Sequence, residues 1–539
     1  SNASIVDALN TADVLVTAAS GGTSNGNISI NAAINTSGSN IFLKSTGGAI
    51  SNTATITGRN VSIDNTGGSI NASTGAISNA ASNSGALTAI NIAENITATG
   101  NLNLYGQATG GVGINLANGK TISGANIQAT GQSSGNFGAL FGYGNVVTTG
   151  SSGDSVITGI STGGGSDAFR NSANLTAAAN TTLTIDGQAT NTGARGMRME
   201  GGGIASGNVT IKGSSNNSTD GLISINGIIT AAANSSLKLI GTTNKAGNVG
   251  AQLSNGGGVN LSSNATVEIT GQNTATTGSG TGILVQGWGI AKGTGATNTG
   301  LVKLTGTTAS TSGSTSVAIQ NGISTDGNID IQGNVVNASN TGIQLGAAVK
   351  SFGAAPTINL DATNGSITGT GAIGDTTNKN ASVIMTTAAT STFSGGINAL
   401  NFTKAGAGTL TLDSWAQATP VMTNVSNSYN INAGRLNLNT GGSYYTVNTK
   451  FININNATTF GATGSNGTWS GNTFVFDSAG GGTLAWSGNP IMNVGTAALT
   501  FKTNGGVTNN ITGWFNMNAG TADVTFDVAA ASTPSNPGL

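Results

Sequence analysis

The stretch TVEITGQN, residues 266–273, decides the fold, because close variants of it return through the middle of the chain. They read NLNLYGQA at 101–108, TLTIDGQA at 182–189, NVTIKGSS at 208–215 and SLKLIGTT at 236–243. The glycine of this phrase recurs about every 28 residues, which is typical of a solenoid. It stands at Gly106, Gly131, Gly159, Gly187, Gly213, Gly241, Gly271, Gly306 and Gly333.

Within each repeat the apolar residues alternate with polar ones, as in Val267-x-Ile269. A period of two predicts a β-strand, and the high Gly, Asn and Thr content disfavours helix. A second alternating pair follows, such as Ile283 and Val285, and often a third short apolar stretch. The sequence therefore predicts an all-β, right-handed parallel β-helix, a β-solenoid with about 28 residues per rung in the middle. We expect the repeated glycine to form a corner that needs positive φ.

Stacked rungs also predict columns of side chains. The residues expected to point inward, in line with one another, are Ile211, Leu239, Ile269 and Ile331. Those expected to form one outward ladder of alternating charge are Lys238, Glu268, Lys303 and Asp330. Such pairs face each other at steps of about 4.8 Å between parallel strands.

Composition limits the chemistry that the chain can perform. The 539 residues include 87 Gly but only 6% charged residues, and 37% are apolar, so we expect a folded rather than a disordered chain. The 17 Lys and Arg are balanced by 18 acidic residues, which predicts no nucleic-acid partner. Without His or Cys there is no imidazole catalysis, thiol nucleophile or disulfide, and we predict no metal site and no cofactor. No apolar run approaches the roughly 20 residues of a membrane span.

The organisation along the chain follows from these patterns. Residues 1–3, SNA, resemble the scar of a cleaved expression tag. We expect irregular β-helix rungs over 4–100, regular rungs over 101–390, aromatic-rich rungs over 391–528 and a linker-like tail over 529–539.

Two phrases in the aromatic-rich region carry a family resemblance: LNFTKAGAGTLTLDS at 400–414 and YNINAGRLNLN at 429–439. Together they resemble the passenger-associated transport repeat of autotransporter passengers. The matching residues are Lys404, Gly406, Gly408, Leu410, Leu412, Asn432, Ala433, Gly434 and Leu436. The rest of the chain is similar in composition to large exported β-helical adhesins, including filamentous-haemagglutinin-like proteins of two-partner secretion, although the Asn-Pro-Asn-Gly signature of that system is missing.

This resemblance implies a secreted or cell-surface protein of a Gram-negative bacterium, acting in cell adhesion and virulence. The implied partners are an outer-membrane translocator and a glycan or protein on a host or neighbouring cell. Autotransport and two-partner secretion both remain open as the export route.

The densest group of charges is the first candidate binding site. Its members fall at equivalent positions on consecutive rungs, with Glu200 close by: Asp167, Arg170, Arg195, Arg198 and Asp220. Three of the five arginines of the protein are here. Planar guanidinium groups suit the recognition of anions or acidic sugars. A salt-bridged ladder that fixes the register of the rungs is the alternative, and we favour it.

Two tryptophans are the second candidates. Trp288 stands between glycines in GWG, and Trp469 lies in NGTWSGN. Both rings could stack on sugar faces, but packing in the core or in a corner is the interpretation that we favour.

These features predict a non-enzymatic extracellular adhesin segment, a rigid stalk whose surface loops attach to cells or glycans. The alternative is a polysaccharide-cleaving β-helical hydrolase or lyase, which needs paired carboxylates roughly 5–10 Å apart. Because the charges mostly alternate in ladders, we predict no catalytic residue. An ice- or mineral-binding threonine face ranks last, since Thr lies in corners rather than in a regular column.

Overall fold

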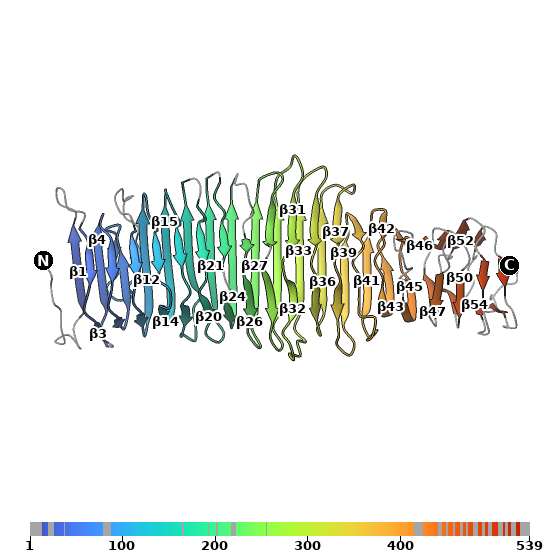
Figure 1. Ribbon diagram of the computed structural model, residues 1–539, viewed down its shortest axis with the longest axis horizontal. Helices are drawn as coiled ribbons and strands as arrows, with labels where there is room; N and C mark the ends of the chain where they lie inside the picture. The colour runs from blue at the N-terminus through green and yellow to red at the C-terminus, as the bar shows by residue number, and fades with distance from the viewer. Residues whose placement is uncertain are drawn as a thin grey trace. The chain divides into compact units, whose positions relative to one another are not determined.

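The structure of the chain is a computed structural model, drawn as a ribbon in Figure 1. It describes residues 13–19, 26–36, 38–78, 88–163, 166–191, 193–200, 203–216, 223–254, 256–413 and 424–439, and after these the strands given below. All described secondary structure is β, without a helix, and parallel strands stack as a β-solenoid of about 27 residues per turn. The predicted fold class is therefore confirmed.

The chain forms two units, and each is a stack of parallel sheets. Unit 1 comprises residues 1–275 and 282–296, and unit 2 comprises 276–281 and 297–539. In unit 1 a full turn contributes one strand to each of three sheets, here called A, B and C in the order in which the chain enters them, whereas the described turns over residues 357–439 contribute strands to sheets A and B only. β31 (Thr281–Val285) crosses the limit between the units, and β8 (Ser69–Ile70) and β9 (Ile77–Ser78) form an antiparallel hairpin outside the three sheets.

The strands of unit 1 are short and regularly spaced. Sheet A contains β1 (Val14–Ala19), β4 (Ile41–Thr46), β7 (Val61–Asp64), β12 (Asn101–Ala108), β15 (Asn126–Ser133), β18 (Ser155–Ser161), β21 (Thr182–Ala189), β24 (Asn208–Ser215), β27 (Ser236–Thr243) and β30 (Thr266–Asn273). Sheet B contains β2 (Ile28–Ile30), β5 (Ile50–Asn52), β10 (Ile90–Ile92), β13 (Ile114–Leu116), β16 (Ala139–Phe141), β19 (Phe169–Asn171), β22 (Met197–Met199), β25 (Ile223–Ile225) and β28 (Val249–Leu253). Sheet C contains β3 (Ile34–Thr36), β6 (Ile56–Gly58), β11 (Ile96–Ala98), β14 (Thr121–Gly124), β17 (Asn145–Thr148), β20 (Asn174–Thr176), β23 (Ile204–Ser206), β26 (Ile228–Ala231), β29 (Gly258–Leu261) and β32 (Gly289–Lys292).

Unit 2 continues the same pattern of parallel pairing. Its sheet A contains β33 (Val302–Thr308), β36 (Ile329–Val335), β39 (Thr357–Ala362), β41 (Ser382–Thr387), β43 (Asn398–Ala405), β45 (Asn424–Ile431), β48 (Phe451–Asn455), β51 (Thr473–Asp477), β54 (Leu499–Asn504) and β57 (Val524–Val528). Sheet B contains β34 (Thr315–Ile319), β37 (Thr341–Leu345), β40 (Ser366–Gly369), β42 (Ser391–Phe393), β44 (Thr409–Asp413), β46 (Arg435–Asn439), β49 (Thr459–Thr463), β52 (Thr483–Ser487) and β55 (Asn510–Thr512). The third position is held by β35 (Ile323–Thr325) and β38 (Val349–Ser351), and later by β47 (Tyr445–Asn448), β50 (Gly467–Ser470), β53 (Ile491–Asn493) and β56 (Asn516–Asn518).

The inward columns are those that the alternation predicts. Ile211 pairs with Leu239 and Leu239 with Ile269, and none of the three is more than 2% exposed. Ile331 is likewise buried in unit 2, in register with Leu304. Apolar side chains stacked at each step fill the narrow interior of each unit, so burial of these columns is the main source of stability.

The outward charges pair as predicted within each unit. In unit 1, Lys238 lies opposite Glu268, with 3.2 Å between Nζ and Oε2. In unit 2, Lys303 lies opposite Asp330, with 3.9 Å between Nζ and Oδ2. These side chains are 22–48% exposed, so each pair contributes less than about 1 kcal/mol.

The role predicted for the repeated glycine is wrong. All nine glycines lie inside described strands of sheet A, and none of them has a positive φ. A Cβ built on Gly159 would lie 2.5 Å from the carbonyl oxygen of Ala168, and one on Gly106 would collide with the carbonyl of Gly113. The glycine is needed because the backbones of sheets A and B approach each other closely at this end of the core.

The corners that do require positive φ lie elsewhere, and asparagine occupies three of them. Asn180, Asn234 and Asn264 have φ of 61°, 57° and 55°. Asparagine tolerates this region better than most residues, and it hydrogen-bonds locally. The side-chain amide of Asn264 donates to Asn234 Oδ1 at 3.3 Å, which ties one corner to the next.

Candidate functional site

The charged residues singled out in the sequence come together on the outer face of sheet B in unit 1. Arg170 is the central residue of β19 and Arg198 that of β22, and the two lie opposite each other in register. The residues on either side of each arginine are buried, so both guanidinium groups lie on the outer face. Asp167 and Arg195 lie just before these strands, where the backbone of Ala168 donates to the carbonyl of Arg195 at 2.8 Å.

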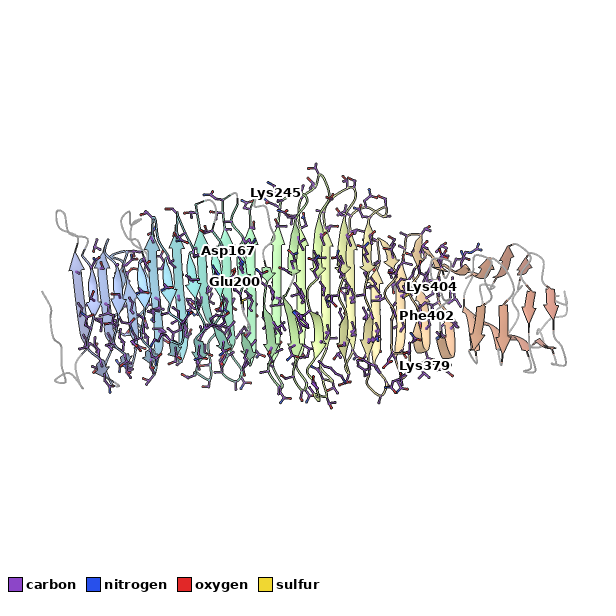
Figure 2. All side chains as sticks on the ribbon, in the orientation of Figure 1. Asp167, Glu200, Lys245, Lys379, Phe402 and Lys404 are labelled. Atoms are coloured by element: carbon purple, nitrogen blue, oxygen red, sulfur yellow. The ribbon has the colours of Figure 1, made fainter. Side chains whose placement is uncertain are left out.

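Glu200 completes the group, which we call the arginine cluster: Asp167, Arg170, Arg195, Arg198 and Glu200. Glu200 follows β22 and forms ion pairs with Arg170 and with Arg198. Asp167 lies 3.9 Å from Arg195 Nη1 and also 3.9 Å from Arg198 Nη1. Figure 2 labels both acidic residues on the ribbon of unit 1. Ion pairs thus run between neighbouring rungs, as the salt-bridged ladder predicts.

Burial, and after it the neighbouring charges, determine the electrostatics of Arg198 in the cluster. Burial lowers the pKa of Arg198, Asp167 opposes this by raising it, and Arg195 and Arg170 lower it further. The guanidinium remains charged at any physiological pH. Arg170 also lies over the ring of Phe137, with 5.7 Å from Cζ to the ring centroid. This cation–π contact holds the head of Arg170 in place on the surface.

Three guanidinium groups face two carboxylates here, so the cluster carries one net positive charge. The side chains in its ion pairs are 10–36% exposed, so part of each side chain is in contact with solvent. A planar guanidinium can donate two parallel hydrogen bonds to a carboxylate or sulfate. The arrangement is therefore able to bind an anionic group.

The other three residues predicted to form sites are Asp220, Trp469 and Trp288, and the structure describes the side chain of only the last. Asp220 lies outside the described residues. Trp469 lies in β50, and its side chain is also outside the described part of the chain. Trp288 lies in the connection between β31 and β32 and is 68% exposed. The packed position that we favoured from the sequence is therefore wrong, and the alternative of an exposed ring holds.

Sequence analysis missed two features, the exposed ring of Tyr143 and the burial of Lys404. Tyr143, in the connection between β16 and β17, is 58% exposed. It has a glycine on each side, like Trp288, and this shared pattern could have identified it.

Lys404, the second, belongs to the transport-repeat-like segment and is fully buried on β43 (Figure 2). Its ammonium group donates to the carbonyl oxygens of Ala405 at 2.7 Å, Gly406 at 2.6 Å and Ala433 at 3.2 Å. Burial lowers the pKa of Lys404 to about 8. The lysine joins the corners of two successive rungs, because Ala405 and Gly406 precede β44 whereas Ala433 precedes β46.

Nothing in the described part of the chain forms a helix long and apolar enough to cross a bilayer. In comparisons with known proteins, the chain matches no family model, no curated protein and no solved structure.

Proposed function

We propose that this chain is a non-enzymatic segment of an extracellular bacterial adhesin, a rigid β-solenoid that attaches to acidic glycans on other cells. The arginine cluster is the observation that carries the proposal. In a protein with only five arginines, three lie on neighbouring rungs with their side chains on one outer face. Export to the cell surface of a Gram-negative bacterium belongs to the same proposal and rests on the transport-repeat resemblance.

The geometry of the cluster favours binding over cleavage. Glycoside hydrolysis needs one carboxyl group that donates a proton and a second that acts as base or nucleophile. Here Asp167 and Glu200 are each engaged by two guanidinium groups. Neither carboxyl group is placed to protonate a glycosidic oxygen.

The test is a binding assay on the purified chain with a panel of acidic and neutral polysaccharides. An Arg195→Gln, Arg198→Gln double variant should weaken binding of an acidic glycan at least tenfold, because each lost charged hydrogen bond is worth about 1.5–3 kcal/mol. The matched control is a Lys212→Gln, Lys238→Gln double variant, which removes the same charge from sheet A of unit 1. Equal loss in both double variants would show only general electrostatic attraction.

The same panel tests the rival activity. We expect no shortening of any polysaccharide and no new reducing or unsaturated ends after prolonged incubation. Cleavage that disappears on substitution of a single aspartate would replace the adhesin proposal with a hydrolase or lyase.

A further inference from the structure

Two exposed aromatic rings project from the same corner of unit 1, the one that leads from sheet B to sheet C. Tyr143 lies between Gly142 and Gly144, immediately before β17. Trp288 lies between Gly287 and Gly289 at the start of β32. Aromatic side chains usually bury most of their surface, and an exposed one forgoes about 2 kcal/mol or more of hydrophobic stabilisation. Both rings are accessible for stacking on the apolar face of a ligand.

Hydrogen bonds and the conformation of the flanking glycines define the backbone around each ring. Tyr143 N donates to Asn118 Oδ1 at 3.0 Å, and Trp288 N donates to the carbonyl of Gly257 at 2.8 Å. Gly287 has φ of 59° and Gly289 has φ of 72°, a region that glycine enters without strain. On the tyrosine side, a Cβ at Gly144 would collide with the backbone of the preceding rung.

The distance between the rings follows from the pairing of sheet C. β17 pairs with β20, β20 with β23, β23 with β26, β26 with β29, and β29 with β32, which makes five steps. At about 4.8 Å per step, the two connections lie about 24 Å apart along the stack. That separation is too long for one sugar and suits a polymer that runs along the rungs.

The arginine cluster lies at rungs between the two rings. Arg170 is on β19, in the turn next to that of Tyr143, and Arg198 and Glu200 are one turn further. Beyond them, still before Trp288, Ile228 at the start of β26 is 38% exposed. A path along this corner therefore meets an aromatic ring, then charge, then an apolar side chain, then a second ring.

We infer that one linear acidic polysaccharide chain binds along this corner strip, which comprises Tyr143, Arg170, Arg198, Glu200, Ile228 and Trp288. The inference rests on the proposed function and names its ligand class. The apolar faces of sugar rings stack on the two aromatic rings, while carboxylate or sulfate groups pair with the guanidinium groups.

Single-stranded nucleic acid would use the same two kinds of contact, but the charge of the strip argues against it. Such proteins follow the phosphate backbone with a continuous positive groove. Here Glu200 offsets one of two arginines, and the whole chain has a net charge of −1. A polysaccharide with one anionic group per repeat unit matches this sparse charge better than a strand with one per nucleotide.

The experiment measures binding of the full chain to chondroitin sulfate polymer and to the disaccharide from the same polymer, by calorimetry. The variants are Tyr143→Ala, Trp288→Ala and the double substitution. Val336→Ala is the matched control, because Val336 is 71% exposed and lies in unit 2. Both rings are on the surface, so the thermal midpoint should stay unchanged in all variants.

We expect the wild-type chain to bind the polymer more tightly than the disaccharide, which is too short to reach both rings. Each single aromatic variant should weaken polymer binding about two- to tenfold. The double variant should lose the advantage of polymer over disaccharide, and Val336→Ala should change nothing.

Two results would overturn the corner strip but leave the proposed function standing. In the first, the affinity for the polymer stays unchanged in the aromatic double variant but is lost in an Arg170→Gln, Arg198→Gln variant. In the second, an oligodeoxythymidine binds more tightly than chondroitin sulfate. If the wild-type chain binds no acidic polysaccharide of a wider panel, the proposed function fails together with the strip.

Discussion

The buried ammonium group of Lys404 should make the stability of unit 2 rise with pH above about pH 8. The group donates hydrogen bonds to three backbone carbonyl oxygens, those of Ala405, Gly406 and Ala433. Among the described residues, no acidic side chain forms an ion pair with Lys404. The cost of removing the ammonium group from water is therefore offset only by the dipoles of the three carbonyl groups. This desolvation lowers the pKa of Lys404 from 10.5 to about 8.

The sign of the effect follows from counting protons. Between pH 8 and 10.5 the unfolded chain keeps a proton on Lys404, whereas the folded chain has lost it. Unfolding then binds a proton, so the free energy of unfolding rises with pH across this window. As pH falls from 10.5 to 8 that stability is lost, and below pH 8 the effect is constant. A pKa lowered from 10.5 to about 8 corresponds to about 3 kcal/mol.

The assay is guanidinium-induced unfolding between pH 7 and 10.5, followed by tryptophan fluorescence. Four of the five tryptophans belong to unit 2, so the signal reports mainly on the unit that contains Lys404. Lys404→Met removes the titrating group, and Lys379→Met, at a half-exposed lysine of the same unit, is the control. The difference in unfolding free energy between wild type and Lys404→Met should increase by about 3 kcal/mol from pH 8 to 10.5.

A difference that stays flat over that range would refute the reasoning. It would show that the three carbonyls stabilise the ammonium form as well as water does. A slope of equal size in Lys379→Met would assign the effect to the general loss of lysine charge at high pH.

Three further predictions concern the stack itself. Ile269→Asp should prevent folding of unit 1 or lower its free energy of unfolding by several kcal/mol, because it buries an unpaired charge. Thr270→Asp, at the next residue on the exposed face, should change the thermal midpoint little. Equal effects of the two substitutions would contradict the assignment of inward and outward residues. Gly187→Ala should be destabilising because its Cβ meets backbone, while Gly110→Ala, with open space around it, should be tolerated, as circular dichroism melts will show. Lys238→Gln should cost less than about 1 kcal/mol, and that cost should vanish in 1 M salt; a loss that persists there would point to packing by its aliphatic stem.

The sequence predicts the columns of this fold well because, in a solenoid, residues one repeat length apart in the sequence lie opposite each other on adjacent strands. Alternation places Ile211, Leu239 and Ile269 inside, and the repeat length puts Arg170 opposite Arg198. The same alternation, from Phe402 to Lys404, would have placed the lysine inside as well. Lysine is usually an exposed residue, however, and one of the three carbonyls that bind its ammonium group, that of Ala433, belongs to a corner one turn away.

The glycine column and the tryptophan were misjudged for a related reason. A sequence shows that a side chain is missing at Gly159, but not that the backbone near Ala168 lies where a methyl group would be. Nor does it show the direction of Trp288, which depends on the dihedral angles of its two glycine neighbours. The position of Glu200 relative to the arginines also depends on the conformation of a connection, which has no repeating pattern.

The turn length of the regular rungs has a consequence for how such a chain reaches its native state. Strands here pair with the next strand of the same sheet about 27 residues along the chain, as β24 does with β27 and β27 with β30. The entropy lost in closing a loop depends only slowly on the length of that loop, so adding another turn to a preformed stack costs about the same for each of these rungs. Within a unit, growth by successive addition avoids the long-range closures that slow the folding of most β proteins. Further turns can therefore be added to such a stack without adding slow long-range closures to its folding.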